Sequence, residues 1–242
     1  MSGSKREGYG GTINGGDSSN PPKLSPKNFI SASTKPIEDL VFHPQDQNII
    51  ATVSEDKTMK VWDFRMANHS LVANYTSANN TNVSTQIKLP IFSYEATDEL
   101  LSIDWNKLDP NQMMCGSMAG DVSFFDIRNI TDFVNIKKHR FGKSAVRSIK
   151  YSNFNKNIFG VGCDNLNFCE LEGDQIKYKF IHKGNKSPII DFDWNHKVDW
   201  SISAISENQE NDYSSGGILQ IFKPLDVFCL SEQEAIQKIA ET

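Results

Sequence analysis

Histidines, cysteines and a serine between glycines are the residues of this chain that could perform catalysis or bind a metal. No two histidines have the H-x-x-x-H spacing that places two imidazoles on one helical face; the five are His43, His69, His139, His182 and His196. The segment Gly116-Ser117-Met118-Ala119-Gly120 has its serine beside the first glycine, not midway between two glycines as in a nucleophile elbow. A glycine-rich phosphate-binding loop is also missing from the sequence. We therefore predict that the protein is not an enzyme, and that it uses no small-molecule substrate, no cofactor and no metal.

Aspartates in turns and cysteines in strands are better explained by structural roles. Asp56, Asp121 and Asp164 occupy equivalent turns, in which a carboxylate accepts hydrogen bonds from local backbone N–H groups. None of the cysteines belongs to a C-x-x-C pair, so we expect buried free thiols instead of a zinc site or a disulfide. The four cysteines are Cys115, Cys163, Cys169 and Cys229.

These turns belong to a sequence unit that recurs four times. Each unit begins with a short apolar strand that ends in an aromatic residue, which we expect to be buried; these residues are Phe42, Trp105, Tyr151 and Trp194. A second aromatic or apolar position follows after 20 residues in the first two units and after 18 in the third, at Trp62, Phe125 and Cys169. The fourth unit has 28 residues before Phe222, but removal of an eight-residue polar insertion, Asn208 to Ser215, restores the spacing of 20.

Repeated units of two or three short strands, divided by turn formers, are typical of an all-β WD40 β-propeller; an unrelated β-sandwich is the alternative. We expect each blade to be a four-stranded antiparallel sheet. Because one sheet cannot bury its apolar face alone, neighbouring blades must stack on it. Residues 36 to 225 supply about four blades of roughly 40–45 residues, whereas WD40 rings usually close with about seven. We therefore expect these blades to be the C-terminal half of a longer seven-bladed ring. A closed four-bladed ring and assembly with a second chain are the alternatives.

The composition divides the chain into three parts. Residues 1–34 are rich in glycine, serine, asparagine and proline, which predicts a disordered segment. Residues 35–226 hold the blades, and a polar excursion from 68 to 97 is expected to be a long loop that contains the outer strand of the first blade near Ile87 to Leu89. For residues 227–242 we predict a short C-terminal helix, because Ser231-Glu232-Gln233-Glu234 has the form of a capping box.

Charge limits the kinds of partner. Residues 1–35 carry five basic and two acidic side chains, so the remainder holds 20 basic and 28 acidic ones. An acidic body favours binding of a basic peptide and disfavours direct binding of nucleic acid, although its acidity can also serve solubility alone. No apolar run approaches the length of a membrane helix and the N-terminus has no apolar signal core, so we expect no membrane association and a nuclear or cytoplasmic location.

The most specific part of the sequence lies in the fourth unit. It comprises Phe180-Ile181-His182-Lys183-Gly184, Ile190-Asp191-Phe192-Asp193-Trp194-Asn195, Trp200, Ser206-Glu207 and Leu219-Gln220-Ile221-Phe222. With Ile37-Glu38-Asp39-Leu40 and Ser54-Glu55-Asp56-Lys57, residues 36 to about 228 resemble the last four blades of the retinoblastoma-associated histone-binding WD40 proteins. The chain also looks like the budding-yeast WD-repeat modulators found with histone deacetylase complexes. This resemblance implies a nuclear, non-catalytic scaffold subunit of a chromatin-modifying or histone chaperone complex, with histones or co-repressor and deacetylase subunits as partners.

The resemblance also implies a peptide-binding surface. The family binds basic peptides through acidic residues on the loops that lead into each blade, and Glu38, Glu99 and Glu207 match three of these positions. Lys143-Ser144-Ala145 stands where the family carries acids. The long N-terminal helix and the sixth-blade insertion with which the family holds histone H4 are not visible here. A related branch, the glutamate-rich WD-repeat ribosome-assembly chaperones, has a similar Ile-Glu-Asp-Leu start, so a scaffold in ribosome biogenesis or another non-chromatin assembly is the alternative function.

Overall fold

The computed structural model describes residues 32–65, 70–76, 82–129, 137–173, 175–185, 187–207 and 217–224, with side chains placed outside 70–76 and 82–88. Within these residues the fold is all-β apart from one 3-10 turn, η2 (Ile127–Asn129). The predicted C-terminal helix, Cys229 and nearly all of the predicted disordered segment lie outside the described residues. No helix in the described part of the chain is long and apolar enough to cross a membrane.

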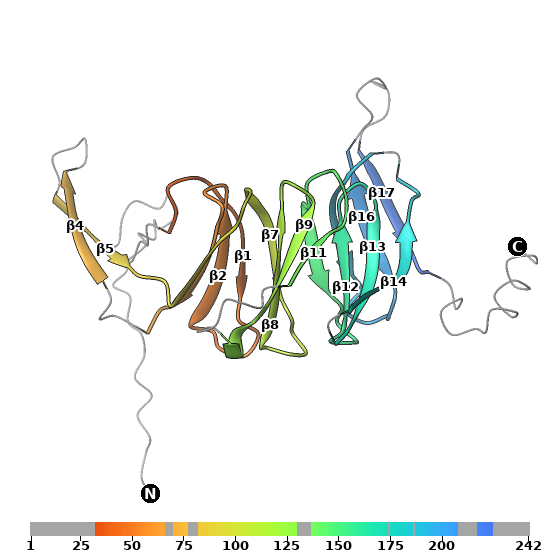
Figure 1. Ribbon diagram of the computed structural model, residues 1–242, viewed down its shortest axis with the longest axis horizontal. Coiled ribbons are helices and arrows are strands. Elements are labelled where there is room, and N and C mark those ends of the chain that lie inside the picture. The colour runs from red at the N-terminus through yellow and green to blue at the C-terminus, as the bar shows by residue number, and fades with distance from the viewer. Residues whose placement is uncertain are drawn as a thin grey trace, which may run out of the picture.

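Four antiparallel sheets follow one another along the chain and stack side by side (Figure 1). Blade 1 contains β1 (Ile37–Phe42), β2 (Ile49–Ser54), β3 (Thr58–Asp63) and β6 (Phe92–Glu95). Blade 2 contains β7 (Leu100–Trp105), β8 (Gln112–Ser117), β9 (Asp121–Asp126) and β10 (Lys137–Arg140). Blade 3 contains β11 (Ser148–Tyr151), β12 (Ile158–Gly162), β13 (Leu166–Glu172) and β14 (Gln175–His182). Blade 4 contains β15 (Ile189–Trp194), β16 (Ile202–Ser206) and β17 (Ile218–Phe222).

The first strand of each blade is its inner strand. β1, β7, β11 and β15 each form one edge of their sheet, and β1, β7 and β11 each contact the inner strand of the next blade. Together they form one wall of the stack. We call the end of the stack at which these strands begin its leading end. This arrangement of consecutive antiparallel sheets confirms the predicted β-propeller blades.

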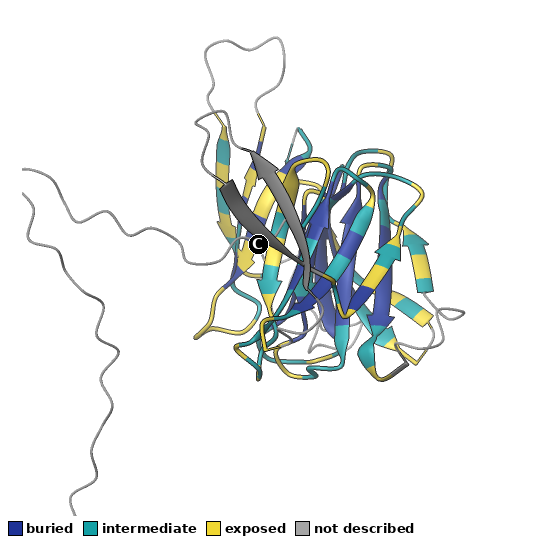
Figure 2. Cartoon of the chain, turned by 90° about the vertical axis from the view of Figure 1, so that its left-hand side faces the viewer, coloured by how far each residue is buried: buried dark blue, intermediate teal, exposed yellow. Residues whose placement is uncertain are grey.

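Apolar side chains fill the spaces between the blades. Three separate clusters lie between blades 1 and 2, 2 and 3, and 3 and 4, and Figure 2 shows the buried residues concentrated along the strands in the interior of the stack. In each cluster the preceding blade contributes its back face and the following blade its front face. The cluster between blades 1 and 2, for example, contains Val53 and Met59 of blade 1 and Trp105 of blade 2. Stacking therefore supplies the burial that a single sheet lacks.

The four aromatic residues that define the repeat do end the four inner strands, but they are not equally buried. Trp105, Tyr151 and Trp194 are 1%, 5% and 2% exposed, as predicted. Phe42 is 56% exposed, so the prediction that it is buried is wrong. Its side chain lies on the front face of blade 1, which no preceding blade covers among the described residues.

Two further expectations need correction. The outer strand of blade 1 is β6, and not the segment near Ile87 to Leu89; residue Ile87 belongs to β5 (Asn82–Lys88), which pairs only with β4 (Ser70–Thr76) in a separate two-stranded sheet. Phe92 of β6 is buried and packs edge-to-face on Phe125 of blade 2, which fixes the outer strand at this point. Blade 4 has three strands among the described residues instead of four, and the predicted insertion Asn208 to Ser215 lies outside them, between β16 and β17.

The prediction of buried free thiols is confirmed for the three cysteines that the structure describes. Cys115, Cys163 and Cys169 are buried free thiols. Burial raises the pKa of the Cys115 and Cys169 thiols to about 12, so both are protonated at neutral pH. A buried protonated thiol behaves as a small apolar side chain and not as a nucleophile.

Candidate peptide-binding site

The three glutamates predicted to bind peptides all lie at the leading end of the stack. Glu38 is the second residue of β1, where the pairing with β2 shifts register. Glu99 directly precedes β7. Glu207 directly follows β16, and its N–H donates to Pro188 O at 3.3 Å beside the start of β15. They therefore share one end of the molecule but occupy three different positions of the repeat.

Two of these glutamates already have a basic neighbour in the chain. Lys35 Nζ lies 3.3 Å from Glu99 Oε1, and Arg147 Nη2 lies 3.7 Å from Glu207 Oε1. Both pairs are exposed, so each is worth only about 0–1 kcal/mol. A lysine or arginine of a partner can replace either basic side chain at small cost. Glu38 is exposed and has no ion pair among the described residues.

The third blade presents a different surface at this end. Asp164, in the turn after β12, accepts hydrogen bonds from the Lys143 N–H at 2.8 Å and from the Ser144 backbone and hydroxyl. These bonds hold the pKa of Asp164 below its usual range. The carboxylate in this position thus anchors its own loop, as the turn aspartates were predicted to do.

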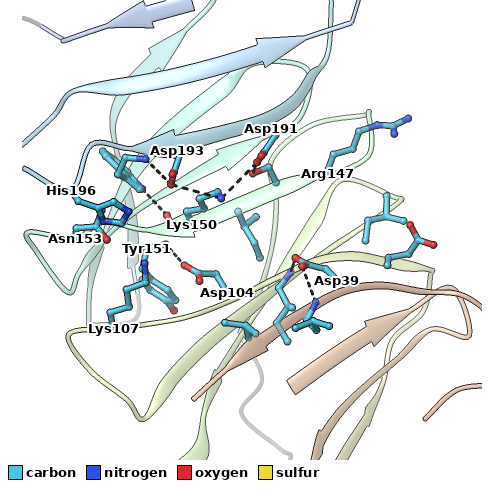
Figure 3. Close-up of a pocket in the computed structure, with 18 residues that line it drawn as sticks. Asp39, Asp104, Lys107, Arg147, Lys150, Tyr151, Asn153, Asp191, Asp193 and His196 are labelled. Carbon is cyan, nitrogen blue, oxygen red and sulfur yellow. Dashed lines mark hydrogen bonds and ion pairs between the residues drawn. The ribbon is translucent and has the colours of Figure 1, made fainter. Parts of the chain in front are cut away.

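A groove runs along the wall formed by the inner strands (Figure 3). Its volume is about 490 Å³, and residues of β1, β7, β11 and β15 line it. Glu38 lies on its border, and so does Arg147, the neighbour of Glu207; Glu99 does not line it. Five carboxylates and three basic side chains contribute to the lining: Glu38, Asp39, Asp104, Asp191 and Asp193, with Lys107, Arg147 and Lys150.

Two of the groove aspartates join neighbouring blades. Asp39 Oδ2 accepts the Ile103 N–H at 3.0 Å, and Asp104 Oδ2 accepts the Tyr151 N–H at 2.6 Å. The inner strands are sheet edges, so their outward N–H groups would otherwise be unpaired within the protein. Each carboxylate therefore accepts a hydrogen bond from a backbone N–H group at the sheet edge of the next blade.

Burial sets the protonation of these two carboxyl groups. It raises the pKa of Asp39, while the N–H donors of Ile103 and Leu40 act in the opposite direction. Burial also raises the pKa of Asp104 to about 6, although the hydrogen bond from the Tyr151 N–H and the charge of the more distant Lys107 lower it. Asp104 consequently carries less than a full charge slightly below neutral pH.

Asp191 and Asp193 lie on the last inner strand and are more open. Lys150 Nζ lies between them, 3.9 Å from Asp191 Oδ1 and 3.8 Å from Asp193 Oδ1, as Figure 3 shows. Asp191 Oδ1 also accepts the Ser148 hydroxyl at 2.6 Å. Both carboxylate side chains are more than half exposed. They are available to a basic group that enters the groove.

The groove aspartates were not predicted as site residues. Ile103-Asp104-Trp105 and Phe192-Asp193-Trp194 show only an alternation of apolar and polar residues, which is equally typical of a solvent-facing strand. The feature of the sequence that could have identified these residues is their type, because aspartate is depleted in strands. Its repetition before the aromatic residue in two blades points to a role in the inner wall.

Two of the histidines have structural contacts. No group of three or more histidine, cysteine, aspartate or glutamate side chains in the described part of the chain is placed to hold a metal ion. His43 stacks edge-on against Trp105, and its Nδ1 accepts the Asp46 N–H at 3.0 Å. His182 stacks on Phe222 and lies 2.6 Å from Gln220 Oε1. These two histidines therefore contribute to packing and turns.

Comparison with known proteins agrees with the repeat. The family model "WD domain, G-beta repeat" matches residues 24–63, which include β1, β2 and β3. WD-40 repeat-containing protein MSI4 of Arabidopsis thaliana is 25% identical, over 94% of this chain and 44% of that protein. Histone acetyltransferase type B subunit 2 of Candida glabrata is 23% identical, over 81% of this chain and 42% of that protein. U3 small nucleolar RNA-associated protein 15 of Saccharomyces cerevisiae is 22% identical, over 82% of this chain and 33% of that protein.

The chain thus spans less than half the length of each of these relatives. The similarity to MSI4 covers nearly the whole chain, and that to the histone acetyltransferase subunit covers about four fifths of it. Residues 24–63 match the WD40 repeat, and the four sequence units and four stacked antiparallel sheets extend this architecture through the described chain. The chain is similar in sequence to MSI4 and to the histone acetyltransferase subunit.

Proposed function

We propose that this WD40 scaffold is a non-catalytic subunit of a nuclear chromatin-modifying or histone chaperone assembly. Its partners are basic segments of histones, or subunits of a co-repressor and deacetylase complex. The binding surface comprises Glu38, Glu99 and Glu207 at the leading end, together with the acidic groove that Glu38 borders.

The observation that carries this proposal is the excess of carboxylates in a groove of peptide size. Five acidic and three basic side chains line about 490 Å³ between the inner strands. An extended peptide with spaced lysines or arginines can place its charges beside Asp191, Asp193 and Glu38, where charge-assisted hydrogen bonds form. Glu207 adds a further acid once Arg147 turns away from it.

The names of the relatives support the chromatin reading. One relative is a histone acetyltransferase subunit, and MSI4 matches over nearly the whole chain. Both matches span the blades that form the groove. A nuclear location follows from this assignment.

Peptide binding by charge-reversed variants tests the proposal. Fluorescence anisotropy with a labelled histone H3 N-terminal peptide should give a Kd that rises with salt, because screening weakens exposed charge pairs. The double variant Glu38→Lys/Glu207→Lys should raise the Kd at least about tenfold, equivalent to roughly 1.4 kcal/mol. Thermal unfolding of this variant should stay close to wild type, since exposed charges usually change stability by under about 0.5 kcal/mol.

A matched control variant distinguishes an effect of charge at the leading end from an effect of the overall charge of the protein. Glu172 is an exposed residue at the end of β13, at the opposite end of the stack, where it pairs with Lys177 at 3.4 Å. Glu172→Lys should leave H3 peptide binding unchanged. Equal Kd values for wild type and the leading-end double variant would refute the acidic surface as the binding site.

A scaffold role in ribosome biogenesis is the second candidate. It is favoured by the similarity to U3 small nucleolar RNA-associated protein 15, and to ribosome biogenesis protein YTM1 of Scheffersomyces stipitis, 25% identical over 67% of this chain. Affinity purification from nuclear extract distinguishes the two. Histones with deacetylase or acetyltransferase subunits support the chromatin proposal, whereas ribosome-assembly factors in their place support the second candidate.

A further inference from the structure

The loop that leads into blade 3 is basic, although the loop that leads into blade 2 is acidic. Residues 140–147 include Arg140, Lys143 and Arg147 and contain no aspartate or glutamate. All three basic residues are exposed. Blade 2, in contrast, is directly preceded by Asp98 and Glu99. The leading end of the stack therefore changes the sign of its charge between two neighbouring blades.

Hydrogen bonds hold this basic loop in place. Arg140 is the last residue of β10; its Nη2–H donates to Ala119 O at 2.6 Å, and its Nε–H donates to Gly142 O at 3.3 Å. Asp164 accepts the backbone N–H of Lys143 at 2.8 Å, so Lys143 uses its N–H and not its ammonium group for this bond. Because the loop is already ordered, a ligand that binds its charges loses little conformational entropy.

The ion pair between Arg147 and Glu207 is long and exposed. Arg147 Nη2 lies 3.7 Å from Glu207 Oε1, and the two side chains are 50% and 47% exposed. A pair of this kind contributes little to stability. Arg147 also borders the groove, and Figure 3 shows its side chain extending away from Lys150. An acidic group of a partner can therefore bind Arg147, and this releases Glu207 for a basic group.

The loop that leads into blade 4 continues the basic surface. Lys183 directly follows β14 and is exposed. The inner strands β11 and β15 contact each other, so the loops that precede them are neighbours at the leading end. The basic side chains are thus spread over two loops. A run of carboxylates along an extended chain fits such separated charges, whereas one small anion reaches only part of them.

We propose that the leading end binds a segment of mixed charge from a partner protein. Aspartates or glutamates of this segment contact the basic loops before β11 and β15, and its lysines or arginines contact Glu38 and Glu99. Arg147 exchanges Glu207 for an acid of the partner. This inference rests on the proposed function, because it specifies the chemistry of the same bound peptide.

Like charges make a purely basic segment a poorer ligand. A lysine of such a segment meets Lys143 and Arg147 over blade 3, and this repulsion weakens binding. A carboxylate at the same place forms charge-assisted hydrogen bonds with them. The basic loops therefore select among basic peptides, in favour of those that carry a neighbouring run of acids.

Two labelled peptides of equal length test the proposal by fluorescence anisotropy. One carries lysines followed by glutamates, and in the other glutamines replace the glutamates; a second pair with the order reversed covers both chain directions. In one of the two orders, wild type should bind the mixed-charge peptide about fivefold more tightly than its glutamine counterpart, as expected for a few exposed ion pairs.

Variants of the basic loop identify the origin of this preference. Lys143→Gln/Arg147→Gln should remove it, and Lys143→Glu/Arg147→Glu should reverse it. Both variants keep the backbone N–H that Asp164 accepts, and thermal unfolding checks that both are folded. Lys156→Gln/Lys177→Gln is the matched control, because these exposed lysines lie at the opposite end of the stack, and it should keep the preference.

Each proposal has its own contradicting result. Equal Kd values of wild type for the mixed-charge and glutamine peptides in both orders, or a preference that survives Lys143→Glu/Arg147→Glu, would overturn the mixed-charge inference and leave the proposed function intact. The proposed function fails instead if Glu38→Lys/Glu207→Lys binds the glutamine peptide as wild type does. A labelled DNA duplex is the last probe. If the duplex, and not the mixed-charge peptide, loses affinity in Lys143→Gln/Arg147→Gln, the basic loops bind nucleic acid and the mixed-charge inference is wrong.

Discussion

Asp104 is a groove residue whose protonation depends on folding. Burial raises the pKa of its carboxyl group from about 3.8 to about 6 in the folded chain. The folded state therefore binds this proton more tightly than the unfolded state, so the group favours folding below about pH 4. That contribution is lost as the pH rises through about 6. Lys107 and Lys150 face the group and limit the shift.

The variant Asp104→Asn should remove this pH dependence. An asparagine oxygen can still accept the Tyr151 N–H, so the link between blades 2 and 3 is kept. Urea denaturation at pH 4, 5, 6 and 7 measures the difference. The unfolding free energy of the variant minus that of wild type should increase by on the order of 2 kcal/mol from pH 4 to pH 7. The other ionisable groups are the same in both proteins, so their contributions cancel in the difference. A constant difference from pH 4 to pH 7 would contradict a raised pKa for Asp104.

At the scale of elements, the distance between blades depends on small residues at the contact. Gly160 in β12 faces Phe192 of β15, and a β-carbon on Gly160 would lie 2.6 Å from Phe192 Cζ. Phe192 is buried and packs edge-on against Phe168, so its ring has little room to move. The absence of a side chain at position 160 thus allows blade 4 to approach blade 3.

Gly160→Ala should therefore destabilise the protein by about 1–3 kcal/mol, the usual cost of overpacking a core. Phe192→Leu in the same chain should recover part of the loss, and a double-mutant cycle measures the coupling. Gly217→Ala is the control, because a β-carbon there meets only Ser206 O at an ordinary 3.4 Å. If Gly160→Ala unfolds at the same denaturant concentration as wild type, the blades do not depend on this close approach.

The inner strands were predictable from the sequence, and their surroundings were not. Each repeat ends its first strand in an aromatic residue, and this fixed the positions of Trp105, Tyr151 and Trp194 because the period-two pattern is local. Phe42 has the same pattern, but its exposure depends on whether another blade covers it. Asp104 reads as a polar strand residue until Tyr151, 47 positions away, supplies the N–H that it binds.

The outer strand of blade 1 illustrates the same limit. The segments around Ile87 and Phe92 both alternate polar and apolar residues, so local sequence does not choose between them. Packing of Phe92 on Phe125 of the next blade makes the choice. The acidic site was likewise only partly predictable: Glu38 borders the groove, whereas Glu99 pairs with Lys35 and does not line it.

At the scale of the whole molecule, the contacts between blades hold the four sheets together. Three clusters of buried apolar side chains lie between neighbouring blades. Trp194 at the end of β15 is 2% exposed, and its Nε1–H donates to Lys150 O of blade 3 at 3.3 Å. Trp194→Ala should therefore lower the free energy of unfolding by about 3–5 kcal/mol, the usual cost of removing a buried aromatic side chain.

Urea denaturation measures this loss against a matched control. Phe42 ends β1 at the position of the repeat that Trp194 has in β15, but it is 56% exposed. Phe42→Ala should therefore cost clearly less than Trp194→Ala, because less apolar surface is removed from the interior. If Trp194→Ala unfolds at the same urea concentration as wild type, the contact between blades 3 and 4 does not stabilise the stack.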